Sequence, residues 1–169
     1  MRVLVASATR HGATGEIAEA IASTLTARGV NAELRRVEDV ADLGGYDAVV
    51  LGSAVYIGKW LEPARQFAED HAAELAMRRT WLFSSGPLGD PPRPDAAHAV
   101  QVDDLIERTH AREHRLFDGK LDPYKVSFLE RTVAKAVRAK AGDFRDWDAI
   151  HGWANSIADT VADVPVAGG

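Results

Sequence analysis

The chain has 169 residues, a formal net charge of −5 and no cysteine. This length suits one domain, and the lack of cysteine excludes a disulfide framework, a thiolate zinc site, a cysteine-ligated iron–sulfur cluster and a catalytic thiol. The acidic balance argues against nucleic-acid binding, and no apolar run approaches the roughly 18 residues of a membrane span. We therefore expect a cytoplasmic protein that binds no nucleic acid and that can touch a membrane only from its surface.

The first half of the chain alternates between short apolar runs and a helical period. Arg2 to Ala6 reads as a buried strand, and Thr14 to Arg28 repeats apolar residues at helical spacing. Gly29 is a natural stop for that helix. We expect further strands over Val30–Val37 and Asp47–Gly52.

The second half repeats this rhythm. The sequence predicts a helix from Pro63 through Leu75 and a strand over Thr80–Ser84. A helix over Val102–His110 and a strand over Glu113–Phe117 follow. The last helix is expected from about Arg145 to Val161.

Strands that alternate with helices predict an α/β protein with a doubly wound, five-stranded parallel sheet. We expect one domain over residues 1–163, with an insertion at 119–142 after the fifth strand and a flexible tail at 164–169. Such sheets bind ligands beyond the carboxyl ends of their strands. The loops expected there are Ser7–Thr14, Ser53–Trp60 and Ser84–Arg93.

The first of these loops has the chemistry of a phosphate site. It lies between a buried strand and a helix N-terminus, where unpaired N–H groups and the helix dipole favour an anion. Thr9 and Thr14 add hydroxyl groups, and Gly12 allows close backbone approach. The loop matches neither GxxxxGK[ST] nor GxGxxG, which disfavours a nucleoside triphosphate or a dinucleotide. The alternative is that both threonines only cap the helix.

The stretch V-A-S-A-T-R-H-G-A-T-G-E-I-A resembles the FMN-phosphate signature of flavodoxins. Thr9, Gly12, Thr14 and Ala18 match the signature, whereas Ser7 stands where an aromatic residue is frequent. The resemblance implies a flavodoxin-like fold that binds FMN. It implies that the phosphate is held by the whole loop, which comprises Thr9, Arg10, His11, Gly12, Ala13 and Thr14. The side chains of Arg10 and His11 either add charge there or point to solvent.

The same resemblance implies that the other two loops flank the isoalloxazine ring. In the second loop the implied cofactor residues are Ser53, Ala54, Val55, Tyr56 and Gly58. Tyr56 is expected to stack on the flavin, and the Gly58 backbone is expected to turn toward the flavin N5. In the third loop they are Ser85, Gly86, Pro87, Leu88 and Gly89. The alternative for Tyr56 and Trp60 is packing beneath the loop.

Three motifs are similar to those of flavodoxin-type, menaquinone-dependent protoporphyrinogen IX dehydrogenases. They are T-R-x-G-x-T, V-V-x-G-S-x-x-Y-x-G and the closing A-G-D-x-x-D-W. This resemblance implies an FMN-dependent oxidoreductase that passes electrons from a tetrapyrrole through FMN to a quinone. The flavin would carry the chemistry, and we identify no catalytic side chain. The alternatives are a flavodoxin-type electron carrier that serves a protein redox partner, and an FMN-binding module without turnover.

The insertion is the basic part of an acidic chain. Six basic and two acidic side chains between Gly119 and Lys140 give it a charge of +4. Residues 125–140 have the pattern of a basic amphipathic helix, which can lie on an anionic membrane or meet an acidic partner or tetrapyrrole carboxylates. The alternative is a solvated face whose apolar stripe packs on the domain.

The run H-A-R-E-H from His110 to His114 matches the H-x-x-E-H motif of inverted zinc proteases. It enters an expected strand, which would turn the two histidines apart, so we expect no metal site.

Overall fold

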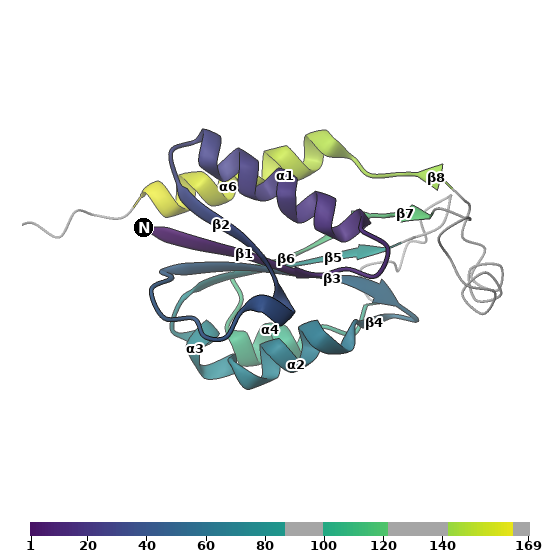
Figure 1. The fold of residues 1–169 in the computed structure, drawn as a ribbon, viewed down its shortest axis with the longest axis horizontal. Helices are drawn as coiled ribbons and strands as arrows, with labels where there is room; N and C mark the ends of the chain where they lie inside the picture. The colour runs from purple at the N-terminus through teal and green to yellow at the C-terminus, as the bar shows by residue number, and fades with distance from the viewer. Residues whose placement is uncertain (87–99, 122–141, 164–169) are drawn as a thin grey trace, which may run out of the picture.

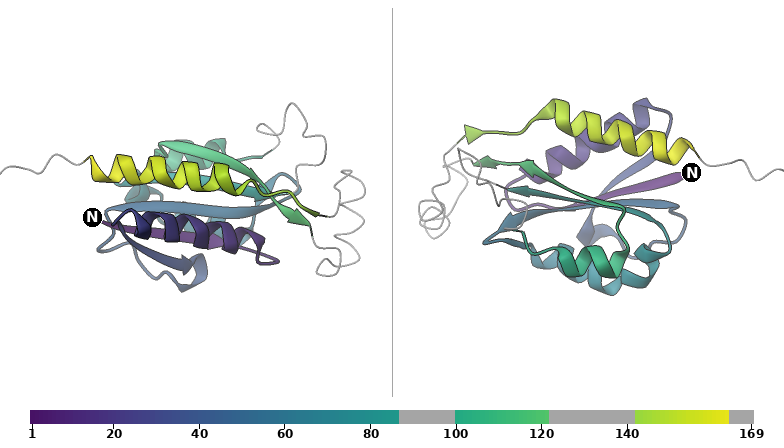
Figure 2. Two further views of the ribbon diagram at one scale, coloured as in Figure 1. Left: turned by 90° about the horizontal axis from the view of Figure 1, so that it is seen from above. Right: turned by 180° about the vertical axis from the view of Figure 1, so that it is seen from behind.

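The computed structural model describes residues 1–86, 100–121 and 142–163. A central sheet is covered by helices on both sides (Figure 1). On one side lie α1 (Ala13–Ala27) and α6 (Trp147–Ala162), which run next to each other in the views of Figure 2. On the other side lie α2 (Glu62–Asp70), α3 (Ala72–Ala76) and α4 (Asp103–Thr109).

The main sheet has the parallel order β2-β1-β3-β5-β6, which confirms the doubly wound, flavodoxin-like prediction. Its strands are β1 (Arg2–Ala8), β2 (Asn31–Arg36), β3 (Ala48–Tyr56), β5 (Arg79–Gly86) and β6 (Glu113–Asp118). The chain reverses its direction of travel across the sheet between β1 and β3. In such sheets, ligands bind at the carboxyl ends of the strands next to this point.

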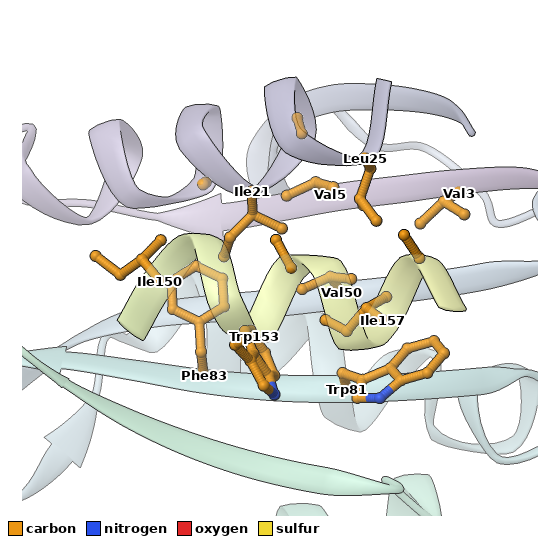
Figure 3. Close-up of a cluster of buried hydrophobic side chains, with 14 of the residues drawn as sticks. Val3, Val5, Ile21, Leu25, Val50, Trp81, Phe83, Ile150, Trp153 and Ile157 are labelled. Atoms are coloured by element: carbon orange, nitrogen blue, oxygen red, sulfur yellow. The ribbon is translucent and has the colours of Figure 1, made fainter. Parts of the chain in front are cut away.

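The sheet is apolar on both faces because its three central strands are buried on both sides. Toward α1 and α6, side chains such as Val5, Val50 and Phe83 meet Ile21 and Ile157 (Figure 3). A second cluster lies on the opposite face, where Leu4, Leu51 and Leu82 pack with residues of α2, α3 and α4.

The edge strand β2 is polar by contrast. Its Glu33 carboxylate pairs with Arg35 and with Arg2 of β1, each at 2.5 Å. Hydrogen bonds from Arg35 and then Arg2 lower the pKa of Glu33 to about 2. Charged side chains therefore line this edge of the sheet.

One of the predicted helices is broken in the middle. The single helix expected from Pro63 through Leu75 is divided at His71, whose backbone leaves helical geometry between α2 and α3. The His71 ring lies 4.6 Å from the Phe67 ring, and its Nδ1 lies 3.1 Å from Glu74 Oε1. These contacts accompany the break and keep the two pieces together.

The largest correction concerns the second loop. The loop expected over Ser53–Trp60 is instead the end of β3, a two-residue turn and β4 (Lys59–Trp60). Val55 pairs with Trp60, and Tyr56 pairs with Lys59, in antiparallel register. We call this unit, residues 53–60, the flavin hairpin, after the role expected of it.

A second small sheet stands at the same end of the molecule (Figure 1). It joins β7 (Lys120–Leu121) to β8 (Gly142–Asp143) in antiparallel register, and we call it the ribbon. Pro87, Leu88, Gly89, the basic stretch 125–140 and the tail 164–169 lie outside the described residues. No helix in the described ranges is long and apolar enough to cross a bilayer.

Candidate functional site

The first loop closes on itself at the carboxyl end of β1. Gly12 N donates a 3.0 Å hydrogen bond to Thr9 Oγ1, so the Thr9 hydroxyl shapes the turn. Gly12 has φ +92°, a left-handed conformation that favours glycine. A Cβ placed there would meet no atom within 4 Å. The loop therefore presents open space directly in front of the N-terminus of α1.

The first turn of α1 supplies donors to that space. Helix geometry leaves the N–H groups of Ala13, Thr14 and Gly15 without intrahelical partners. Thr14 is 2% exposed, and its hydroxyl forms no hydrogen bond within the part of the chain that the structure describes. Glu16 N returns to Gly12 O at 3.0 Å, so the helix begins directly after the turn. We call this set of donors the cradle, because N–H groups at a helix N-terminus suit an anion.

The flavin hairpin starts beside this cradle because β1 and β3 are neighbours. Ser7 pairs with Gly52, and Ala8 pairs with Ser53. At the tip of the hairpin Ile57 and Gly58 both have positive φ, 49° and 73°. Ile57 is 66% exposed. The apolar tip thus projects from the sheet at the edge where ligands bind in this topology.

A cation–π contact connects the two loops. The Arg10 guanidinium carbon lies 4.9 Å from the centre of the Tyr56 ring, and Tyr56 is half-buried. This contact brings the first loop and the hairpin together across the ends of β1 and β3. His11 is exposed in the same loop. The sequence-predicted residues of both loops therefore gather at one edge.

Hydrogen bonds of Ser53 and Trp60 hold the hairpin in place. Ser53 Oγ is buried, accepts a hydrogen bond from Leu61 N at 3.0 Å and donates one to Ala54 O at 2.8 Å. Trp60 is 3% exposed, and its Nε1 donates to Ser84 Oγ at 2.7 Å. Ser84 Oγ lies 2.8 Å from His114 Nε2. A polar chain thus joins the hairpin through β5 to β6.

The end of β5 completes the edge. Ser85 is buried and pairs with Ala54 of the hairpin. Gly86 packs so closely that an added Cβ would lie 3.2 Å from Val55 Cβ. Its carbonyl accepts a hydrogen bond from Gly119 N at 2.9 Å. Here the end of β5 meets both the flavin hairpin and the start of the ribbon.

Residues 4–148 match the family model described as a flavodoxin domain. The chain belongs to the flavodoxin family. It is 32% identical to the protein named protoporphyrinogen IX dehydrogenase [quinone] of Escherichia coli K12, over 94% of this chain and 95% of that one.

Solved flavodoxins share this fold at low sequence identity. A flavodoxin from the domain Archaea has a TM-score of 0.64 at 16% identity, covering 96% of this chain and 99% of that one. The oxidised Flavodoxin 1 from Bacillus cereus has a TM-score of 0.62 at 18% identity, covering 98% of this chain and 100% of that one.

FMN is the cofactor of this flavodoxin-family chain. The donor set of the first loop fits its phosphate, since a dianion suits backbone N–H groups at a helix N-terminus and a threonine hydroxyl. The open space in front of Gly12 gives the phosphate room.

Two ionisable groups of β6 have shifted pKa values. Burial lowers the pKa of His114 below 6.5, against a smaller opposing effect of Asp103. Burial, with a smaller contribution from Asp146, raises the pKa of Asp118 above 3.8. Asp118 ends β6 beside Gly86, at the carboxyl edge of the sheet, whereas His114 lies near the start of the strand.

Sequence reasoning missed Arg145, which is buried next to the cradle. Its side chain is 3% exposed and forms a two-pronged pair with Asp143, at 2.8 Å from Nε and 2.6 Å from Nη2. Hydrogen bonds from Arg145 lower the pKa of Asp143 to about 2. Arg145 also contacts Glu16 and the Ala13 carbonyl of α1. The sequence does not indicate its link to the first loop, because Ala13 and Glu16 lie about 130 residues away along the chain, although Asp143 is close by.

The H-A-R-E-H run is not arranged as a metal site. His110 ends α4 in a left-handed conformation and is exposed, whereas His114 faces Ser84. Within the described ranges, no group of three or more metal-ligating side chains is found.

Proposed function

We propose that this protein is an FMN-dependent oxidoreductase that takes electrons from protoporphyrinogen IX and passes them to a quinone. The similarity to the Escherichia coli enzyme over nearly the full length of both chains supports this substrate and acceptor. The main structural support for the site is the contact between the first loop and the flavin hairpin, where the Arg10 guanidinium carbon lies 4.9 Å from the centre of the Tyr56 ring. When bound, FMN would supply two-electron redox chemistry, so the six-electron oxidation of one protoporphyrinogen IX to protoporphyrin would take three cycles and three quinones.

The first loop would hold the phosphate. The N–H groups at the start of α1 and the Thr14 hydroxyl would donate to it, and Thr9 would maintain the turn through Gly12. Arg10 would add positive charge on the solvent side of the loop, next to the exposed His11. Because these donors are fixed by the strand and the helix, binding would require little reordering.

The flavin hairpin and the end of β5 would flank the ring. Tyr56 would offer an aromatic face, and the backbone around Gly58 would offer polar groups to the ring nitrogens. Ala54 and Val55 would lie against the ring, whereas Ser85, which pairs with Ala54, and Gly86, which packs on Val55, would hold the hairpin beside it. The Ser53 hydroxyl is already engaged within the hairpin, so its part would be to hold the hairpin in shape.

The basic sequence of residues 125–140 suggests a further role at the substrate end. Its positive charge would suit the carboxylates of a tetrapyrrole or an anionic membrane that carries the quinone. This part of the proposal is made from the sequence alone, because the stretch lies outside the described residues.

The decisive experiment is turnover with FMN-loaded protein. Under anaerobic conditions, protoporphyrinogen IX and a menaquinone analogue should yield fluorescent protoporphyrin at a rate that depends on FMN and on both substrates. A protein that binds FMN and exchanges electrons with artificial donors, yet gives no protoporphyrin above the uncatalysed rate, would instead be an electron carrier.

The phosphate assignment is tested by Thr14→Ala. Loss of one charge-assisted hydrogen bond should cost about 1.5–3 kcal/mol of FMN binding, roughly a tenfold to hundredfold increase in Kd. Thr26→Ala is the matched control, since Thr26 lies on the same helix and its hydroxyl bonds to Ala22 O at 2.9 Å. Flavin fluorescence quenching measures both. Equal dissociation constants for the two variants would contradict the assignment.

A further inference from the structure

Arg145 lies where the ribbon meets the first turn of α1. Its guanidinium donates both prongs to Asp143 of β8, and its Nη1 reaches the Ala13 carbonyl at 3.3 Å. The same nitrogen contacts Glu16. The face of the guanidinium covers the Trp147 ring, with its carbon 4.6 Å from the ring centre. One side chain therefore joins β8, α1 and the start of α6.

The ribbon is in turn attached to the end of β5. Phe144 N donates to Gly119 O at 3.2 Å, and Gly119 N donates to Gly86 O at 2.9 Å. A Cβ on Gly119 would approach the Gly86 carbonyl carbon to 2.8 Å, so only glycine fits there. Two of the three segments expected to surround FMN are thus linked by a continuous set of contacts through the ribbon.

We infer that Arg145 is a positioning residue for the FMN phosphate, which it serves by fixing the first turn of α1 against the ribbon. This inference rests on the proposal that the first loop holds the phosphate. Arg145 is not a phosphate ligand, because its charge is met by two carboxylates, Asp143 and Glu16. It acts through geometry: a planar fork fixes both angle and distance between the segments it joins.

A lysine cannot reproduce that fork although it keeps the charge. Arg145→Lys therefore tests whether Arg145 acts by holding the first turn of α1 in place or only by attracting the phosphate through its charge. We expect Arg145→Lys and Asp143→Asn each to raise the Kd for FMN by about tenfold, the size expected when one charged hydrogen-bonding pair is broken. Attraction by charge alone would leave the Lys variant close to the wild type.

Riboflavin, which lacks the phosphate, is the second probe. If Arg145 positions the phosphate cradle, the two variants should bind riboflavin within about threefold of the wild-type protein. Equal losses for FMN and riboflavin would overturn the inference, because they would indicate a general loss of stability.

Arg28→Met is the matched control. Arg28 also joins α1 to α6, through Asn155 at 2.9 Å and Asp159 at 2.5 Å, but at the opposite end of α1. It should change neither dissociation constant by more than about threefold. If Arg28→Met weakens FMN as much as Arg145→Lys does, the inference is wrong. If the wild-type protein binds FMN no better than riboflavin, the phosphate assignment itself has failed.

Hydrogen exchange on the wild-type protein gives a test that needs no variant. If the Arg145 contacts strengthen phosphate binding, then phosphate binding must strengthen the Arg145 contacts by the same free energy. FMN should therefore slow exchange of the amides at 119–121 and 142–145 more than saturating riboflavin does. Equal protection by the two ligands would contradict the inference.

Discussion

Buried tryptophans lie on both faces of the sheet, with Trp153 and Trp81 on one face and Trp60 on the other. Trp153 and Trp60 have different partners. The Trp153 ring, on the sheet-facing side of α6, has its centre 5.6 Å from that of Phe117 and 6.2 Å from that of Phe83. Its indole N–H donates to the partly exposed Glu113 carboxylate at 2.9 Å. Trp60, on the opposite face, donates to the buried Ser84, which adjoins His114. On the first face the rings pack on one another and the Trp153 N–H bonds to a carboxylate at the edge of the core. On the second face Trp60, Ser84 and His114 form a series of polar contacts.

This difference follows from what each tryptophan supports. Trp153 belongs to a helix that only covers the sheet, so apolar contact is sufficient. Trp60 belongs to the flavin hairpin, whose position relative to β5 and β6 must be fixed in direction as well as in depth. Hydrogen bonds fix the orientation of the hairpin because they are directional, whereas apolar contact is not. The comparison predicts that the two faces respond differently to substitution and to pH.

The largest effect is expected from Gly52→Ala on the aromatic face. The new Cβ would lie 2.1 Å from the Phe83 ring, which is fully buried and cannot move aside. We expect a loss of about 3 kcal/mol in the free energy of unfolding, or roughly 6–12 °C in Tm. Adding Phe83→Leu to this variant should recover part of the loss by making room. Thermal melts of the two variants decide the matter, and an unchanged Tm for Gly52→Ala would show that the face is not tightly packed.

A smaller effect should separate the two tryptophans themselves. Trp60→Phe and Trp153→Phe remove the same volume, so their difference isolates the indole N–H. Trp60→Phe should cost about 1 kcal/mol more in chemical unfolding, because it leaves the buried Ser84 without its donor while water can reach Glu113. The reverse order of stability would contradict the comparison.

The smallest expected effect is the pH dependence that His114 gives to the polar face. Burial depresses the pKa of His114 in the folded state, so below 6.5 the unfolded chain takes up a proton first. The contribution of His114 is therefore complete above pH 6.5 and is lost as the pH falls through its folded pKa. Asp118, whose folded pKa is raised, changes stability in the opposite direction and at lower pH.

His114→Gln isolates this contribution, because its side-chain oxygen can still accept from Ser84 but cannot titrate near neutrality. Between pH 7.5 and pH 5.5, around the ordinary histidine pKa of about 6.5, Tm should fall more in the wild-type protein than in His114→Gln. Parallel curves for the two proteins would show that His114 stays neutral in both states or is charged in both.

The sequence predicted the repeated strand–helix order, because buried parallel strands are continuous valine-rich and leucine-rich runs that stop at small residues. It also predicted the first loop, because Thr9, Gly12 and Thr14 lie within six residues of one another. The hairpin was missed because Ser53 and Ala54 have low strand preference, which their pairing with β1 and β5 overrides. Arg145 was missed because its partners at Ala13 and Glu16 lie far away in the sequence.

The charged border of β2 has a consequence for the behaviour of the molecule in concentrated solution. An uncapped strand at the margin of a sheet offers free amide and carbonyl groups to any extended peptide that comes alongside. The Arg2–Glu33–Arg35 cluster covers that margin with ionic groups that an incoming strand would have to strip of water. Self-association through β-sheet extension is thereby discouraged on this side.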